Sequence, residues 1–467
     1  MGHTRGGSRD GGVIQSKGMR SGRSVDIEVP RRRAWIWHGI PMLSWALVLV
    51  GLVKCVAPGP IEVLSSSFER DVRQALPNRA VGHYRQIAAH LGEPFGGYGT
   101  LDAFVSQFQV VMLSHMACGL RNVALADMSK RVEVRDLLGE VARRARDPSV
   151  SVFGKDPALV EGWGDENLYL SHLALVIGCR QLGDDRAADR DEVRLHDRLA
   201  NHLRDASLAD GDWHARSFPG SPKFPADQSV TLLALKLYDE LRGTDLAVEP
   251  IEGWLTFMQS QEATTSEGLH RSCLDSDYPG SEVARGCALS WTCAYMAQFA
   301  PVVASELYQR YVAMRFDSVL GCGGFREWPR GYGGHLDFDT GPIVMGLGVA
   351  ATGLGLAAAR LHRDEGVYAS ILQSAGTVGV LATPADRRHY RLSPLLGDAI
   401  LLHGVTARHW FEAPPPVDIE HVRPIASGAM LVLAGIGAVS LWAMIRICRH
   451  AIAWRVAHGV LGPGWLG

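Results

Sequence analysis

The stretch FREWPRGYGGHLDFDTGPIVMG crowds six ionisable side chains before it turns apolar: Arg326, Glu327, Arg330, His335, Asp337 and Asp339. Carboxylates and imidazoles at this density can exchange protons with a substrate. Pro342 suits the first turn of a helix, so Asp339 is expected at a helix start that faces a cavity. We predict a catalytic role for Asp339, and substrate contacts for Trp328 and His335. The two arginines and Glu327 are predicted to form a salt-bridged brace that holds the loop.

A second candidate motif, WGDENLYLSHL, combines an acid, a phenol and an imidazole. His172 lies three residues after Tyr169 and seven after Asp165, so the three side chains share one face of a helix. An imidazole titrates near neutrality and can act as acid or base. We therefore predict that His172 and Asp165 are catalytic, although a core histidine bonded to a backbone group would also explain His172. Tyr169 and Trp163 are predicted to line the substrate pocket.

Two further segments, FPADQS and CLDSDYPGSEVARGCALSW, supply a third aspartate, an arginine and two cysteines. Asp227 and an aspartate of another helical hairpin could act as acid and base across a sugar, and Arg285 is predicted to bind the substrate. Each aspartate alone is also explained as a helix N-cap, whereas capping does not explain the whole set. Cys273 and Cys287 are fourteen residues apart. They suit a disulfide, plain packing, or reactive thiols beside Arg285.

Long apolar helices must position these residues, and one repeated pattern predicts where they are. A polar loop ends in an acidic or small residue, and an apolar run rich in small side chains follows. Such runs start at Leu101, Trp163, Phe224, Arg285, Asp337 and Ser393, at intervals of roughly 52 to 62 residues. Charged, amphipathic segments lie between them. We predict an all-α fold, an (α/α)6 toroid with the apolar helices inside, or alternatively an open α-solenoid of the same hairpins.

Composition and charge narrow the class of protein. The 467 residues are 47% hydrophobic, and the net charge of -2 argues against a nucleic-acid-binding protein. Segments 34–56 and 425–445 contain uncharged apolar runs that are long enough to cross a bilayer as helices. Arginines follow the positive-inside rule at the outer ends of both runs, which predicts that both termini are cytoplasmic.

The chain therefore divides into five predicted segments. They are a disordered basic tail (1–33), a transmembrane helix (34–56), an extracytoplasmic domain (58–420), a second transmembrane helix (425–445) and a cytoplasmic tail (446–467). A signal peptide is the alternative for the first helix, and a buried core helix for the second. The predicted location is the cell membrane, with the lipid bilayer as a partner and the large domain outside the cytoplasm, which is the periplasm if the organism is a Gram-negative bacterium. No CxxC pair occurs, so no metal site is expected.

The run DENLYLSHL resembles the inner-helix motif of the linalool dehydratase/isomerase-like family. The segments REWPRG, DFDTGP and FPADQS are similar to segments of membrane-anchored bacterial relatives of that family. The resemblance implies an (α/α)6 barrel in which His172 matches a cavity histidine that takes part in acid–base chemistry, with Tyr169 and Asp165 beside it. It also makes three cysteines candidates for the family's catalytic thiols: Cys273, Cys287 and Cys293.

Three functions are compatible with these residues. We expect a membrane-anchored lyase or isomerase without a cofactor, acting on a small, mainly apolar alcohol such as an isoprenoid alcohol. The first alternative is a glycoside-processing enzyme that uses paired carboxylates such as Asp227 and Asp339. The second is a non-catalytic binding or scaffold protein of the cell envelope. A narrow apolar cavity with one histidine would favour the lyase, and a cavity filled by side chains would favour the scaffold.

Overall fold

The fold was analysed in a computed structural model. It describes residues 77–90, 102–151, 163–181, 189–319, 322–334, 339–379, 381–382, 387–390, 395–411 and 446. The chain divides into two compact units, and all of these residues except Arg446 belong to the unit that spans Leu49–Leu441. Both predicted transmembrane helices and the tail 1–33 lie outside the described residues. Within the part that is described, no helix combines the length and the apolar character that crossing a bilayer requires.

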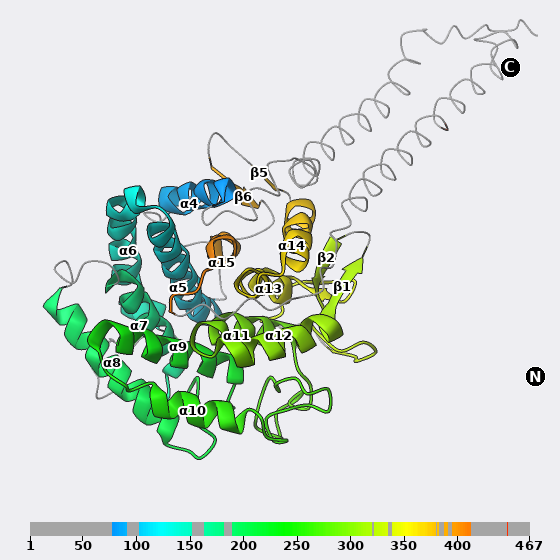
Figure 1. Cartoon of the computed structure of the whole chain (residues 1–467), viewed down its shortest axis with the longest axis horizontal. Coiled ribbons are helices and arrows are strands. Elements are labelled where there is room, and N and C mark those ends of the chain that lie inside the picture. Colours follow the sequence, from blue (N-terminus) through cyan, green and yellow to red (C-terminus); the bar gives the residue numbers. More distant parts are fainter. Residues whose placement is uncertain are drawn as a thin grey trace, which may run out of the picture. The chain divides into compact units, whose positions relative to one another are not determined.

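Helices dominate the described residues, which confirms the all-α prediction. Six of them follow one another in a closed cycle of contacts: α5 (Asp102–Ala126), α7 (Asn167–Gln181), α9 (Pro225–Arg242), α11 (Gly286–Phe299), α13 (Val349–Leu361) and α15 (Leu395–Thr406). Each packs against the next, and α15 packs against α5 (Figure 1). The chain therefore returns to its first inner helix after passing through the other five.

Six further helices pack against the inner helices but are not part of the cycle. They are α4 (Asn78–His90), α6 (Arg131–Ala145), α8 (Arg190–Leu208), α10 (Val248–Phe257), α12 (Pro301–Arg315) and α14 (Glu365–Val378). Burial follows the sequence pattern. In α7 every side chain except Arg180 is buried, whereas in α8 the buried residues recur every three or four positions along one face, as at Leu195, Leu199 and Leu203. An all-round apolar helix needs neighbours on every side, and an amphipathic one needs them on one side only.

Small residues let the inner helices approach closely. A side chain at Gly178 of α7 would meet Leu237 of α9 at 2.7 Å, and one at Gly404 of α15 would meet Leu356 of α13 at 2.8 Å. Interiors are packed to crystal density, so these positions leave no room for even a methyl group.

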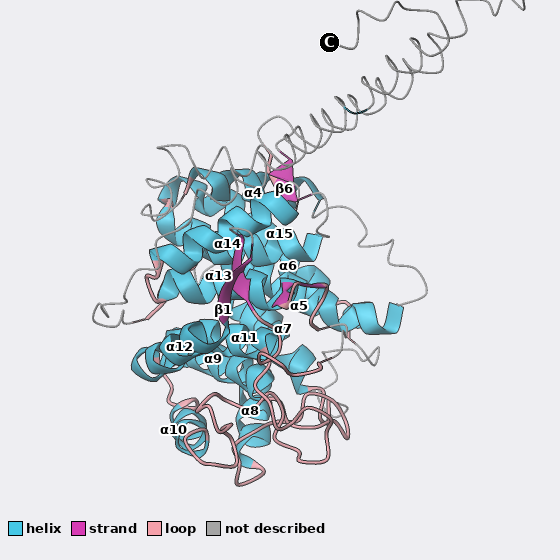
Figure 2. Ribbon diagram, turned by 90° about the vertical axis from the view of Figure 1, so that its right-hand side faces the viewer, coloured by secondary structure: helices cyan, strands magenta, loops and turns pink. Residues whose placement is uncertain are grey.

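Short strands interrupt the helical pattern in one part of the chain, where the sequence predicted helices throughout. Three antiparallel pairs form: β1 (Phe316–Val319) with β2 (Cys322–Phe325), β3 (Ile343–Val344) with β4 (Leu347–Gly348), and β5 (Leu381–Ala382) with β6 (His389–Tyr390). Figure 2 shows how short they are beside the helices. The predicted helix start at Asp337 is wrong because a β-hairpin forms where the first turns of the helix were expected. Pro342 precedes the β3–β4 hairpin, whose turn has positive φ at Met345 and Gly346, and the helix begins only at Val349.

Candidate active site

Backbone contacts gather the starts of four inner helices. The amide of Leu168, in the first turn of α7, donates to the carbonyl of Ser217 in the loop before α9. The amide of Gly286, the first residue of α11, donates to the carbonyl of Glu327 at 2.8 Å. The amide of Ala350, near the start of α13, donates to the carbonyl of Thr340. The loop before α9 is therefore held at the start of α7, and the segment before α13 is held at the start of α11.

Asp227 occupies the first turn of α9 and is half-buried. It is not the helix cap, because Phe224 holds that position in an extended conformation. The hydroxyl of Ser217 donates to the Asp227 carboxylate instead. The pKa of Asp227 is raised to about 7, mainly by burial and to a smaller extent by the charge of Asp339, while the Ser217 hydrogen bond partly opposes both effects. Near neutral pH this carboxyl group therefore holds its proton for about half of the time.

Asp339 is exposed and lies in a turn just before the β3–β4 hairpin. Its negative charge raises the pKa of two groups, the Asp227 carboxyl and the Cys287 thiol. The structure thus brings Asp227 and Asp339 close enough to repel each other, although 112 residues separate them in the sequence. Such repulsion keeps one member of a carboxyl pair protonated while the other is ionised.

Glu327 is a third carboxylate at this end, and it is fully buried. Its Oε1 accepts from Nε of Arg285 at 3.1 Å and from the Cys287 thiol at 3.1 Å, and its Oε2 accepts from the Cys287 backbone N–H at 3.1 Å. The carboxylate therefore satisfies the first turn of α11 and is neutralised by Arg285. Burial, followed by the Glu327 charge, raises the pKa of the Cys287 thiol well above its usual range, so this thiol is protonated.

The predicted salt bridges among Arg326, Glu327 and Arg330 do not form, because each of these residues has another partner. Arg326 and Arg330 both bind Asp317, at 3.2 and 2.7 Å, and Glu327 turns inward to Arg285. Consecutive residues of an extended segment point to opposite sides. Glu327 therefore cannot join its two arginine neighbours on the outer side.

Aromatic rings flank the charged groups. The Arg285 guanidinium lies 5.0 Å from the centre of the Trp328 ring, and Trp328 stacks on Tyr332 with ring centres 5.3 Å apart. The rings of Phe224 and Tyr278 also meet edge to face, with their centres 5.7 Å apart. Tyr278 and Tyr332 are both exposed. We call Asp227, Asp339, Glu327, Arg285, Cys287 and Ser217, together with these rings, the helix-start cluster.

The residues of the WGDENLYLSHL motif do not share one site. Asp165 is exposed in the turn before α7, whereas Trp163 is buried with its ring against the His202 edge. The Tyr169 hydroxyl donates to the carbonyl of Ala145 at the end of α6, between outer and inner helices. His172 is fully buried among the inner helices. His335 and Asp337 lie outside the described residues.

His172 has a polar partner, but its partner is a side chain and not the backbone group of the alternative interpretation. Its Nδ1 lies 2.6 Å from Oγ of Ser114, and its ring meets the edge of Trp291. Within the described residues its Nε2 has no hydrogen-bond partner. Burial lowers the pKa of His172 to about 3, so the imidazole is neutral at physiological pH and is a weak base.

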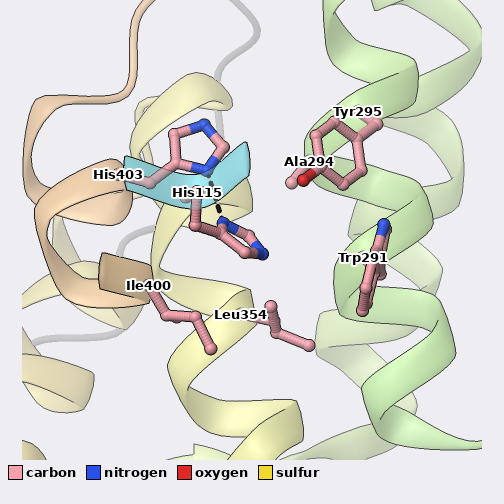
Figure 3. Close-up of a pocket in the computed structure, with 8 residues that line it drawn as sticks. His115, Trp291, Ala294, Tyr295, Leu354, Ile400 and His403 are labelled. Atoms are coloured by element: carbon pink, nitrogen blue, oxygen red, sulfur yellow. Dashed lines mark hydrogen bonds between the residues drawn. The ribbon is translucent and has the colours of Figure 1, made fainter. Parts of the chain in front are cut away.

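Two histidines that the sequence did not single out meet in the centre of the inner helices. Nδ1 of His115 on α5 lies 2.9 Å from Nδ1 of His403 on α15. Figure 3 shows both rings facing Trp291 and Tyr295 of α11, with Leu354 and Ile400 beside them. The centre of a water molecule can occupy about 10 Å³ of the space between them, which is room for about one water. Side chains therefore fill most of the space around these two histidines. In the sequence, this pair is visible only as two histidines that stand in apolar segments.

The remaining chemistry of the described residues is limited. No group of three or more metal-ligating side chains is gathered there. The six cysteines in this part of the chain are all free, so Cys273 and Cys287 form no disulfide. The Cys273 thiol points to the carbonyl of Asp275, and Cys293 is fully buried on α11. No known family model matches this chain, and no curated protein matches it in sequence.

Proposed function

We propose that this chain is an acid–base enzyme that cleaves the C–O bond of a glycosidic substrate at the helix-start cluster, without a cofactor. The observation that carries the proposal is the pair of aspartates. Asp227 is half-buried with a pKa raised to about 7, and the exposed Asp339 contributes the negative charge that helps to raise it. Two carboxyl groups with separated protonation states are the requirement for general acid and general base at one bond.

The roles follow from exposure and charge. Asp227 is protonated for about half of the time at neutral pH and in that form would donate its proton to the glycosidic oxygen as the bond breaks. Asp339 carries its negative charge at the surface, where water is available, and would take a proton from the attacking water. The exposed Tyr278 and Tyr332 rings would pack against the sugar. Arg285 is held by Glu327 and Trp328 and would contact substrate hydroxyls from a fixed position.

The architecture that we propose for the whole domain is an (α/α)6 toroid. The closed cycle of contacts through α5, α7, α9, α11, α13 and α15 supports it. Six outer helices, each packed on this cycle, support it further. An open solenoid would leave its first and last inner helices apart. The predicted membrane helices at 34–56 and 425–445 remain part of the proposal and would tether the domain outside the cytoplasm.

A second candidate is the lyase or isomerase acting on a small, mainly apolar alcohol. The observation that favours it is the apolar tip of the β3–β4 hairpin, where Val344 and Met345 are exposed five and six residues beyond Asp339. In this version Asp227 protonates the leaving hydroxyl group. His172 is a poorer proton donor, because it is neutral and buried beside a centre that has room for about one water.

The experiment separates the candidates by product. The purified full-length chain is incubated with pooled envelope glycans and, separately, with isoprenoid alcohols, and products are identified by mass spectrometry. Asp227→Asn and Asp339→Asn should each lower the turnover by about 100-fold or more, the contribution of one general acid or base. Asp136→Asn, at an exposed position on α6, is the matched control. Equal turnover in all four proteins would contradict the assignment, and no turnover in either pool would favour the non-catalytic scaffold.

A further inference from the structure

A groove lies where the inner helix α9 ends and the outer helix α10 begins. The last turns of α9, its left-handed C-cap Gly243, the first turns of α10 and Phe299 at the end of α11 line it. We call it the α9–α10 groove. Its volume is about 410 Å³, which is within the range of small-molecule pockets. Glu240 in this groove lies 13 residues after Asp227 on the same helix, or about 20 Å along its axis. The groove is therefore separate from the helix-start cluster.

Part of the groove is apolar and open to solvent. Val248, Ile251 and Phe299 supply this part. Val248 is 50% exposed, and the other two side chains are only partly buried against the core. Phe299 is supported from below by the edge of the fully buried Trp254, with ring centres 6.2 Å apart. An apolar group that covered these three side chains would remove their surface from water, which is favourable.

The charged part of the groove is mainly negative. It contains three carboxylates, those of Asp239, Glu240 and Glu252, against one ammonium group, that of Lys236. Lys236 is paired with Glu240 at 2.8 Å, and its Nζ lies 5.4 Å from the centre of the Phe411 ring. Neither Asp239 nor Glu252 forms an ion pair with any residue that the structure describes. The groove therefore keeps two negative charges that no side-chain cation balances.

The end of α9 adds to this negative potential. The amides of Gly243 and Thr244 both donate to the carbonyl of Asp239. The carbonyls that follow it carry the partial negative charge of a helix C-terminus. The positive start of α10 does not offset this charge in the groove, because the Asp239 carboxylate already accepts the amides of Leu246 and Ala247, at 2.9 and 2.8 Å. A ligand that complements the groove therefore combines a cation with an apolar group.

We propose that the α9–α10 groove binds a small organic ammonium compound with an apolar body. The ammonium group would lie between Glu252 and the carbonyl end of α9, and the apolar body would cover Val248, Ile251 and Phe299. A carboxylate of the same shape would instead meet the unpaired negative charges and be repelled. The inference does not depend on the proposed enzymatic activity, because none of these residues belongs to the helix-start cluster.

Three probes of one shape test the sign of the charge: 4-phenylbutylamine, 4-phenylbutanol and 4-phenylbutyrate. Their binding to the purified full-length chain in detergent is measured by isothermal titration calorimetry, with the detergent solution alone as the blank. We expect the amine to bind most tightly and the carboxylate most weakly. Raising the salt concentration should weaken binding of the amine but not of the alcohol. Equal affinities for the amine and the alcohol, or no binding of the amine, would overturn the proposal.

Substitutions locate the bound amine. Glu252→Gln should weaken its binding about two- to fivefold, the effect of one ion pair at an exposed position, and Ile251→Ser should weaken binding of both the amine and the alcohol. Glu249→Gln makes the same charge change on α10 outside the groove, where Glu249 pairs with Arg204, and should leave the affinity unchanged. Asp339→Asn should also leave it unchanged. An unaltered affinity in Glu252→Gln, or a weaker one in Asp339→Asn, would show that the amine binds elsewhere.

Discussion

Asp227 should make the protein less stable at neutral pH than at acidic pH, and Asp227→Asn should remove that loss. In the folded protein the pKa of Asp227 is raised from 3.8 to about 7. The folded state therefore holds a proton that the unfolded state has released between these two pH values. Its contribution to the free energy of unfolding is complete below pH 3.8, falls as the pH rises to about 7 and is constant above that. The full fall is at most about 4 kcal/mol, since one pKa unit is worth about 1.4 kcal/mol.

Denaturant unfolding at several pH values from 4 to 8 measures this directly. Asparagine keeps the shape of the side chain and can still accept the Ser217 hydroxyl, but it cannot ionise. The free energy of unfolding of Asp227→Asn, minus that of the unsubstituted chain, should rise steadily up to about pH 7 and then level off. When both proteins also carry Asp339→Asn, this difference should level off at a lower pH, because the charge of Asp339 raises the pKa of Asp227. A difference that does not change with pH would refute the burial argument, and the exposed Asp136→Asn should show no such trend.

Two further substitutions test how the helix starts and inner helices are held. Glu327→Gln should lower the free energy of unfolding by about 3 kcal/mol or more, because it removes the buried carboxylate that pairs with the Arg285 charge. The double variant Glu327→Gln/Arg285→Gln should be closer in stability to the unsubstituted chain. Denaturant unfolding measures both. Gly178→Ala should cost about 1–3 kcal/mol through its clash with Leu237, whereas Gly211→Ala, which has nothing within 4 Å, should have little effect on the melting temperature.

Helix positions were largely predictable, because they depend on local residues. The apolar runs of α9 and α11 were expected from Phe224 and Arg285, and those residues are the N-caps of the two helices. The same argument placed Asp227 and Asp339 at the starts of two different inner helices, and the start after Asp339 was wrong. The β3–β4 hairpin was missed because each of its strands has only two residues. So short a segment shows no alternation that periodicity can detect.

The partners of individual side chains were far less predictable, because they depend on which segment, distant in the sequence, packs beside each side chain. Glu327 was assigned to its sequence neighbours, yet its partner Arg285 is 42 residues away. His115 and His403 are 288 residues apart and meet only because the cycle of inner helices closes. Helical spacing correctly placed Tyr169 and His172 on one helix, but adjacent turns of an inner helix face different neighbours. Tyr169 consequently reaches α6, while His172 reaches α5.

The proposed acid–base chemistry belongs at the helix-start cluster and not at the buried histidines. These histidines would have to become cations to act as acids, and burial opposes that change so strongly that the pKa of His403 falls to about 4 and that of His172 to about 3. The same burial has the opposite consequence for a carboxyl group, which it keeps protonated and able to donate. The pKa of Asp227 is therefore close to neutral pH, whereas burial keeps the histidines uncharged at that pH. A substrate of the proposed enzyme need not enter the space between the inner helices to reach Asp227, and substitutions that enlarge that space should leave the proposed turnover unchanged.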